Sequence, residues 1–218
     1  MASRGIGRPR SRASTSGLST EEDILRAAAT LFCEVGYGST STYAIAESAG
    51  ISQASMYHYF GGKHAILLAL LLRTVEPSVA VATALLDRGE PAEARLWALC
   101  SYDVRLLVSG EQNTGSLYLL PELSDERFAE FHVERQRLAD VYAGLVAAVG
   151  ARVAGGAAAE ASWLVFGLVE SVILRRRTGS VGGDVAGQIA DAALRVLGVP
   201  EDRIAAARAD GEALLHSL

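Results

Sequence analysis

The chain has 218 residues, of which 50% are hydrophobic and 21% charged, with a formal net charge of −5 at pH 7. This composition is typical of a folded globular protein and excludes a disordered chain, and the net negative charge argues against a general polyanion binder. The charge is uneven, because residues 1–65 sum to +1 (six Arg and Lys against five Asp and Glu) and the remainder therefore to −6.

Two cysteines, Cys33 and Cys100, are too few for a disulfide framework and fit no metal-ligand spacing. We therefore expect reduced thiols in a cytoplasm, no metal and no cofactor. The N-terminus lacks the apolar core of a signal peptide. The longest uninterrupted apolar run, residues 65–72, is far shorter than the roughly 20 residues of a membrane-spanning helix, so we expect no membrane partner.

The first 18 residues carry four arginines and no acidic residue among many glycines and serines. This composition predicts a flexible basic arm over 1–18. Within it, Gly7, Arg8, Pro9 and Arg10 resemble the core of an AT-hook, an element that enters the DNA minor groove. The alternative is a solvated tail without a binding role.

A first helix is predicted to begin at Thr20, which acts as its cap, with Asp23 three residues later. Its acidic first turn suits the positive end of a helix. Gly36 ends it. Apolar residues at helical spacing give it one core face: Ile24, Ala28, Leu31, Phe32 and Val35.

Residues 40–63 predict two short helices, 42–49 and 53–59, joined by a tight turn. Ser41 or Thr40 caps the first helix and Ser52 the second. Gly50 lies where the chain needs a left-handed conformation. Met56 and Phe60, four residues apart, point to the core. Two helices joined by a glycine-containing turn form a helix-turn-helix unit, and residues 19–65 are therefore predicted to be a DNA-binding domain.

The outward face of the second short helix is crowded with hydrogen-bonding groups. Gln53 can read adenine with two hydrogen bonds, Ala54 can contact a thymine methyl, and hydroxyls together with Lys63 can hold phosphates. The alternative is a surface helix whose aromatic residues are half buried in the core. The predicted DNA-binding residues are Thr42, Tyr43, Ser52, Gln53, Ala54, Ser55, Tyr57, His58, Tyr59 and Lys63.

Residues 36–63, GYGSTSTYAIAESAGISQASMYHYFGGK, resemble the DNA-binding signature of the TetR family of bacterial repressors. The match consists of a Gly-Tyr pair, a Thr, Ile-Ala, Ala-Gly-Ile-Ser, a Tyr, an aromatic-Phe pair and a Lys three residues after that Phe. The resemblance covers about residues 21–72. It departs at Tyr43, where family members often carry Arg or another polar residue. It implies an N-terminal DNA-binding domain followed by a divergent helical regulatory domain.

The remainder, residues 66–218, is predicted to be entirely helical, so the fold class is all-α. A helix begins at Lys63 and is kinked or reset at Pro77. Gly61, Gly62 and Lys63 do not form a phosphate loop, because Tyr57 stands where that motif needs glycine. Further helices are predicted over 91–109, 116–120, 126–153, 157–177, 185–197 and 201–215.

The helix over 157–177 is rich in small residues, which let helices approach closely: Ala157, Ala158, Ala159, Ala161, Ser162, Gly167 and Ser171. The helix over 185–197 carries a stripe of Ile189, Ala193, Val196 and Leu197. The family resemblance implies that these two helices form a four-helix dimer interface, and we expect a homodimer. The alternative is that both stripes serve the core of one subunit.

Large aromatic residues gather in the regulatory domain, and an apolar pocket with a few polar groups is typical of small-molecule sites. The predicted ligand-binding residues are Trp97, Tyr102, Tyr118, Phe128, Phe131, His132, Trp163 and Phe166. Such a lining favours an apolar or aromatic ligand. The alternative is that these aromatic residues are plain core.

The leading hypothesis is a repressor that binds an inverted-repeat operator on double-stranded DNA as a dimer and is released by a small molecule. A second hypothesis is an architectural DNA-binding protein without ligand control. The third is a helical enzyme using His132 with Glu130 or Glu134, although the sequence contains no known catalytic motif.

Overall fold

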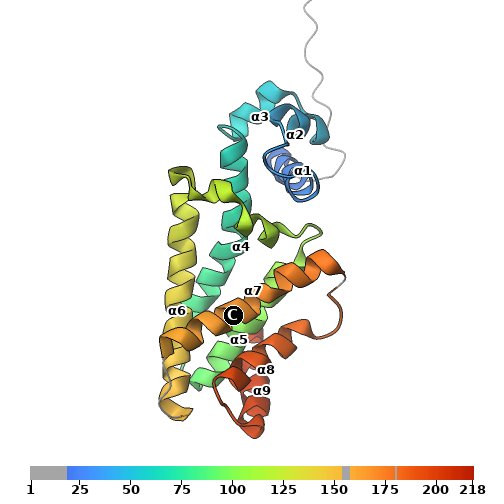
Figure 1. Cartoon of the computed structure of the whole chain (residues 1–218). Helices are drawn as coiled ribbons and strands as arrows, with labels where there is room; N and C mark the ends of the chain where they lie inside the picture. Colours follow the sequence, from blue (N-terminus) through green and yellow to red (C-terminus); the bar gives the residue numbers. More distant parts are fainter. Residues whose placement is uncertain (1–18, 154–157, 180) are drawn as a thin grey trace, which may run out of the picture. The chain divides into compact units, whose positions relative to one another are not determined.

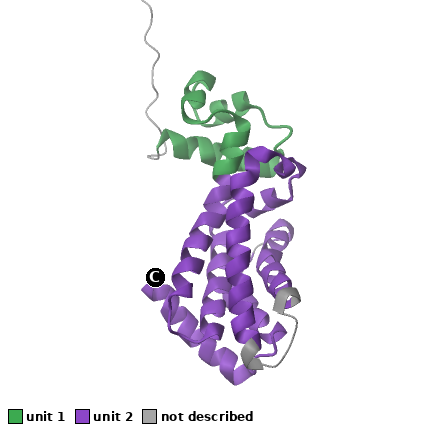
Figure 2. Ribbon diagram, turned by 90° about the vertical axis from the view of Figure 1, so that its left-hand side faces the viewer, with its two compact units in different colours: residues 1–69 green, residues 70–218 purple. Residues whose placement is uncertain are grey.

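The computed structural model describes residues 19–153, 158–179 and 181–218. The chain divides into two compact units, unit 1 (residues 1–69) and unit 2 (residues 70–218), which Figure 2 colours separately. The predicted basic arm, residues 1–18, lies outside the described residues. The boundary between the units falls a few residues beyond the position expected from the sequence.

Every regular element of the described residues is helical, which confirms the all-α prediction. The α-helices are α1 (Thr20–Glu34), α2 (Thr42–Ser48), α3 (Gln53–Tyr59), α4 (Lys63–Leu86), α5 (Ala92–Ser109), α6 (Ala129–Val153), α7 (Ala158–Thr178), α8 (Val185–Val196) and α9 (Glu201–Ser217). Three short 3₁₀ helices connect α5 to α6: η1 (Thr114–Leu119), η2 (Pro121–Ser124) and η3 (Glu126–Phe128).

Serine side chains cap α1, α2 and α3. Ser19, Ser41 and Ser52 each accept a hydrogen bond from the backbone N–H three residues later, at 3.2, 3.1 and 3.0 Å. Each bond satisfies a donor that the first turn of a helix leaves unpaired. The cap of α1 is therefore Ser19, and the sequence-based choice of Thr20 was wrong by one residue.

The helix-turn-helix is held by a small core and by a glycine in the left-handed conformation. Each of the three helices contributes a fully buried apolar side chain: Ile24 from α1, Ile45 from α2 and Met56 from α3. Gly50, in the turn between α2 and α3, has φ of +72°, a region that side chains rarely tolerate. The predicted left-handed turn is confirmed, and it fixes the direction in which α3 leaves α2.

Unit 2 is built around α5, which packs against α6, α7, α8 and α9 (Figure 1). Because it is surrounded, α5 is buried on nearly every side, including Trp97, Cys100 and Asp103. A helix covered all round is normally apolar. Polar residues buried on α5 are therefore the first places to look for binding chemistry.

Two predicted boundaries differ from the structure. Pro77 lies inside α4, which continues to Leu86 rather than restarting there. The segment before α6 forms 3₁₀ turns, because Pro121 starts a new turn at η2 and the Asp125 side chain then accepts from the Arg127 N–H at 3.0 Å. The long helix therefore begins at Ala129, three residues later than expected.

Helix α4 is long and apolar enough to cross a membrane by length and composition alone. Its apolar residues, however, form a buried stripe that includes Leu71, Val75, Ala82 and Leu85. A stripe buried in the protein's own core accounts for the apolar character of α4.

Candidate DNA interface and ligand cavity

The nine predicted DNA-contacting residues other than Lys63 lie on the surface of unit 1, on α2, α3 and the Ser52 cap. None of the nine is buried, and Tyr43, Tyr57 and Tyr59 are 61%, 50% and 50% exposed. Large aromatic side chains left in water are a frequent mark of binding surfaces. Met56 lies on the opposite side of α3 and is fully buried.

A chain of polar contacts joins the two short helices on this surface. Gln53 Nε2 donates to Thr42 Oγ1 at 2.8 Å, and Thr42 Oγ1 lies 3.4 Å from Tyr57 Oη. Ser52 Oγ and Ser55 Oγ are 2.8 Å apart. The bond to Thr42 orients the Gln53 amide and uses one of its two N–H groups. The amide oxygen and the second N–H are left over, which is the pair that reads adenine.

Lys63 is directed back into unit 1. Its Nζ lies 2.6 Å from the carbonyl oxygen of Tyr37, 2.9 Å from that of Thr40 and 3.5 Å from that of Gly38. It also lies 4.3 Å from the centroid of the Tyr37 ring. An ammonium has three donors, so all of them serve the loop between α1 and α2. Lys63 therefore holds this loop in position.

The described part of unit 1 is acidic overall. Its two cations, Arg26 and Lys63, stand against five Asp and Glu residues. Arg26 pairs with Asp23 at 3.0 Å, and Lys63 is bound to the loop. The four arginines of residues 1–18 are therefore most of the positive charge in the N-terminal part of the sequence.

Unit 2 contains a small cavity of about 20 Å³, in part open to solvent, between α4, α5, η1, α6 and α7. Its lining consists of Thr74, Val75, Ser78, Asp103, Leu107, Tyr118, Arg135, Leu138, Phe166, Val169 and Glu170. That volume holds about one water molecule, although an apolar wall with a few polar groups is the usual make-up of sites that bind small molecules.

Asp103 is the most unusual group of this cavity. Its side chain is buried, and its Oδ2 accepts a hydrogen bond from the Tyr142 hydroxyl at 2.7 Å. Burial raises its pKa to about 7, although hydrogen bonds from the Ser78 and Tyr142 hydroxyls lower it and Glu170 raises it further. Near neutral pH, this carboxyl group is therefore protonated in part of the molecules.

The other polar groups of the cavity are paired. Arg135 Nη1 lies 2.5 Å from Glu170 Oε1, and the guanidinium sits 4.8 and 5.3 Å from the ring centroids of Tyr118 and Phe166. Tyr118 Oη donates to Thr74 Oγ1 at 2.6 Å, and burial raises its pKa to about 12. Arg135 is therefore held by one carboxylate and two aromatic faces.

Two of the eight predicted ligand residues, Tyr118 and Phe166, line this cavity. Phe131 packs behind Tyr118, with ring centroids 5.4 Å apart, and Phe128 is buried in the core. Sequence reasoning missed the polar lining, Asp103 above all. The available signal was a carboxylate on the otherwise apolar side of α5.

The remaining predicted residues lie elsewhere. His132 Nε2 is 2.7 Å from the Leu123 carbonyl oxygen, and Trp163 is 76% exposed on α7. Tyr102 is half buried on α5 outside the cavity lining. None of these three borders the cavity, because helical spacing identifies a face but not the neighbour that covers it.

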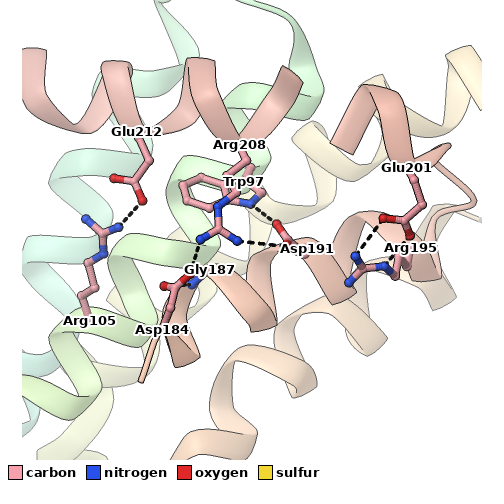
Figure 3. A network of polar contacts seen from close by, with 9 residues as sticks. All are labelled: Trp97, Arg105, Asp184, Gly187, Asp191, Arg195, Glu201, Arg208 and Glu212. Atoms are coloured by element: carbon pink, nitrogen blue, oxygen red, sulfur yellow. Dashed lines mark hydrogen bonds and ion pairs between the residues drawn. The ribbon is translucent and has the colours of Figure 1, made fainter. Parts of the chain in front are cut away.

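Trp97 is a structural anchor rather than part of the cavity lining. Its Nε1 donates to Asp191 Oδ1 at 2.7 Å, and Arg208 donates to Asp191 Oδ2 at 3.1 Å and also to Asp184 (Figure 3). Gly211 passes so close that a Cβ there would lie 2.6 Å from Trp97 Cε3. Trp97 therefore fastens α8 and α9 to α5.

Helix α7 presents an apolar stripe to solvent. Trp163, Leu164 and Leu174 are 76%, 47% and 56% exposed, and Gly167 and Ser171 lie between them at helical spacing, also exposed. A Cβ added at Gly167 would meet nothing within 4 Å. The small residues at the centre of this stripe allow another helix to approach closely, and the large apolar residues on either side can pack against it.

The predicted stripe on α8 is only partly exposed. Ala193 is fully buried in unit 2, whereas Val196 is 48% exposed and Ile189 and Leu197 are half buried. The side chains of Ala157, Ala158 and Ala159 lie outside the described residues. Among the described residues, no group of three His, Cys, Asp or Glu side chains is arranged to hold a metal ion.

A helix-turn-helix unit with an exposed polar second helix, followed by a larger helical unit with a cavity, defines a helix-turn-helix DNA-binding regulator. Residues 24–70 match the family model for bacterial regulatory proteins of the tetR family. Over 61 residues the chain is 39% identical to the HTH-type transcriptional regulator UidR of Escherichia coli K12. That alignment spans 28% of this chain and 31% of UidR, so it covers about a third of the curated relative.

Similarity over the whole chain comes from solved structures. The crystal structure of Mycobacterium smegmatis AmtR matches with a TM-score of 0.87 and 44% identity, over 94% of this chain and 98% of that one. AibR, solved in complex with isovaleryl coenzyme A and operator DNA, shares the fold, with a TM-score of 0.69 and 21% identity over 84% and 100% of the two chains. The chain belongs to the TetR family of bacterial transcriptional regulators. The resemblance predicted from residues 36–63 is confirmed.

Proposed function

We propose that this TetR-family regulator is a cytoplasmic repressor that binds an inverted-repeat operator as a homodimer and is released by a small molecule. The observation that carries the proposal is the exposed polar and aromatic face of α3, held outward by the Ser52 cap and the Gly50 turn. Genomic footprinting of the protein would test it. Footprints without a shared inverted repeat would contradict it.

Base reading is assigned to Gln53 and phosphate contacts to the surrounding hydroxyls. The hydrogen bond that Gln53 donates to Thr42 Oγ1 fixes the Gln53 amide before DNA arrives, so less side-chain freedom is lost on binding. Tyr43, Tyr57 and His58 lie on the same surface and complete the proposed interface. The arginines of residues 1–18 add phosphate contacts, which compensate for the acidic character of the described part of unit 1.

The homodimer is proposed to form through the exposed stripe of α7 together with Val196 of α8. One helix-turn-helix binds too weakly for specific regulation, and a two-fold dimer presents two recognition helices to half-sites about one helical turn apart, or about 34 Å. In solution, the apolar side chains of the stripe cost free energy unless they are covered.

Gly167 offers a sharp test of this interface. Gly167→Arg has room in a single subunit, because a Cβ at that position meets nothing within 4 Å, but it obstructs a close helix–helix contact. Light scattering is expected to report a dimer for the wild type and for Gly167→Ala at micromolar concentration, and a monomer for Gly167→Arg. If Gly167→Arg remains a dimer with unchanged DNA affinity, the interface lies elsewhere.

Ligand control is proposed to act through α4. This one helix begins at Lys63 in unit 1 and supplies Thr74, Val75 and Ser78 to the cavity of unit 2. A ligand that shifts the cavity part of α4 also shifts its first turn, and with it the loop that Lys63 holds. The expected coupling between ligand and DNA is about 1–3 kcal/mol, typical of allosteric proteins.

An architectural DNA-binding protein is the second candidate. A single measurement, the DNA affinity of the protein with and without a bound compound, distinguishes it from a ligand-controlled repressor. Compounds that bind the cavity would be added to the protein–operator complex, and DNA affinity followed by fluorescence anisotropy. If occupied protein binds DNA as tightly as empty protein, ligand control is absent and the architectural alternative gains. The enzyme hypothesis has little to support it, because His132 bonds the Leu123 carbonyl and Glu134 pairs with Arg137 at 2.9 Å.

A further inference from the structure

We propose that Asp191 and Arg208 are positioning residues for the homodimer, because they fix the rotation of α8 about its own axis and so decide which of its side chains face the partner subunit. This inference rests on the proposed homodimer, whose interface includes Val196 of α8, and it names the bonds inside one subunit that orient that interface. Figure 3 shows the two residues where α5, α8 and α9 meet.

The buried side of α8 offers little shape by which its rotation could be fixed. The buried residues at its middle are small: Ala186, Gly187, Ala190 and Ala193. Larger apolar residues, Val185 and Leu194, are buried only near its two ends. Apolar contact is non-directional, and a row of small side chains forms no ridge that interlocks with a neighbouring helix. Directional hydrogen bonds therefore have to select one rotation of α8.

Asp191 supplies two such bonds, one to each neighbouring helix. Its Oδ1 accepts from Trp97 Nε1 of α5 at 2.7 Å, and its Oδ2 accepts from Arg208 Nη1 of α9 at 3.1 Å. Trp97 is fully buried and the Asp191 side chain is 15% exposed, so water does not readily replace these bonds. A rotation of α8 that moves Asp191 away leaves a buried indole N–H without its acceptor, which is unfavourable.

Arg208 holds α8 at a second point. Its guanidinium also pairs with Asp184, which caps the first turn of α8 by accepting from the Gly187 N–H at 3.0 Å. Asp184 and Asp191 are seven residues apart, about two helical turns, and therefore lie on the same side of the helix. A Cβ at Gly187 would lie 2.4 Å from Asp184 Oδ2 and 2.8 Å from Arg208 Nη2, so this close approach needs a glycine. Held at two points along one side, α8 cannot rotate without breaking an ion pair.

The proposed dimer contact lies on other residues of α8. Val196 is 48% exposed and Ile189 is half buried, and neither takes part in the bonds of Asp191 or Arg208. A loss of those bonds therefore changes the dimer only through the position of α8. If about a third of the subunits then hold α8 in the binding position, the dimer dissociation constant rises roughly tenfold, because both subunits have to be in that position at once.

The experiment is analytical ultracentrifugation of the labelled full-length protein from nanomolar to micromolar concentration, with the dimer dissociation constant as the result. Subunit exchange between two labelled samples replaces it where the dimer does not dissociate in that range. Asp191→Asn keeps an oxygen that accepts from Trp97 but removes the charge that pairs with Arg208. Arg208→Met removes the donors and keeps an apolar stem. Each variant is expected to raise the dissociation constant, or the exchange rate, roughly tenfold.

Two control variants separate positioning from general stability. Arg88→Met removes the bonds of Arg88 to Glu90 and to Ser217 of α9, at 3.0 and 3.1 Å, neither of which involves α8. Leu123→Ala removes a buried side chain of η2 and should lower the thermal midpoint. Both controls should change the dissociation constant by no more than about twofold, as expected for independent sites.

The outcomes distinguish this inference from the proposed function. If either Asp191→Asn or Arg208→Met dimerises as tightly as the wild type, the inference is overturned and the homodimer stands. It is also overturned if either control variant weakens the dimer as much as they do. If the wild type itself is a monomer at micromolar concentration, the proposed homodimer fails, and the inference fails with it.

Discussion

Replacing Lys63 by Met tests whether this side chain holds the protein or the DNA. Met keeps much of the apolar stem and removes the ammonium that donates to the carbonyl oxygens of Tyr37 and Thr40. A hydrogen bond to a charged group contributes about 1.5–3 kcal/mol, and partial exposure of Lys63 reduces this. We expect unit 1 to lose about 2 kcal/mol of stability in total.

Hydrogen exchange followed by mass spectrometry measures this loss unit by unit. A loss of about 2 kcal/mol corresponds to roughly 30-fold faster exchange of the protected amides of α1–α3, because exchange follows the local opening equilibrium. Peptides from α5, α8 and α9 serve as the internal control and should not change. Gln53→Ala, an exposed substitution on the same unit, should leave exchange nearly unaltered.

The DNA-binding data complete the test. A displaced α1–α2 loop should weaken binding to cognate and scrambled duplexes alike, with the salt dependence nearly unchanged. If Lys63→Met instead leaves exchange unchanged and lowers the salt slope by about one unit, the ammonium contacts a phosphate in the complex. That result would contradict the conclusion that Lys63 serves to hold the α1–α2 loop.

Three further measurements address the recognition surface, the α5–α9 contact and the cavity. Gln53→Ala should cost roughly 1–3 kcal/mol on the cognate duplex and little on random DNA in anisotropy titrations, and Thr42→Val should give a smaller loss of the same kind; equal losses on both duplexes would remove Gln53 as a base reader. Gly211→Ala, whose Cβ would meet Trp97, should lower the thermal midpoint, whereas Gly144→Ala in the open space beside α6 should raise it slightly; the reverse order would contradict the packing. Asp103 binds its proton more tightly in the folded state, with a pKa of about 7 against the usual 3.8, so the unfolding free energy should fall by up to about 4 kcal/mol between pH 4 and 7. Asp103→Asn should flatten that decline in denaturant titrations, and an unchanged pH profile would mean that Asp103 is ionised in the fold.

The DNA-binding half of the molecule could be predicted because its signals are local. Ser41, Ser52 and Gly50 act on backbone groups within a few residues of themselves, so their effect can be recognised without the tertiary structure. Met56 and Phe60 mark the inner side of α3 by their spacing alone, and the exposed side follows by exclusion. The Lys63 contacts could not be predicted in this way, because their partners lie 23–26 residues away.

In the regulatory half, the spacing of apolar residues was enough to predict the helices and their apolar faces, whereas the partner of each face depends on how the helices pack. Trp97 and Phe166 have the same aromatic character, but Trp97 is covered by Asp191, 94 residues further on, and Phe166 borders a cavity. Asp103 could be recognised as a carboxylate on the buried side of its helix, but not as one that borders that cavity. Helical periodicity describes one helix, whereas a cavity depends on side chains from several helices that meet at one point.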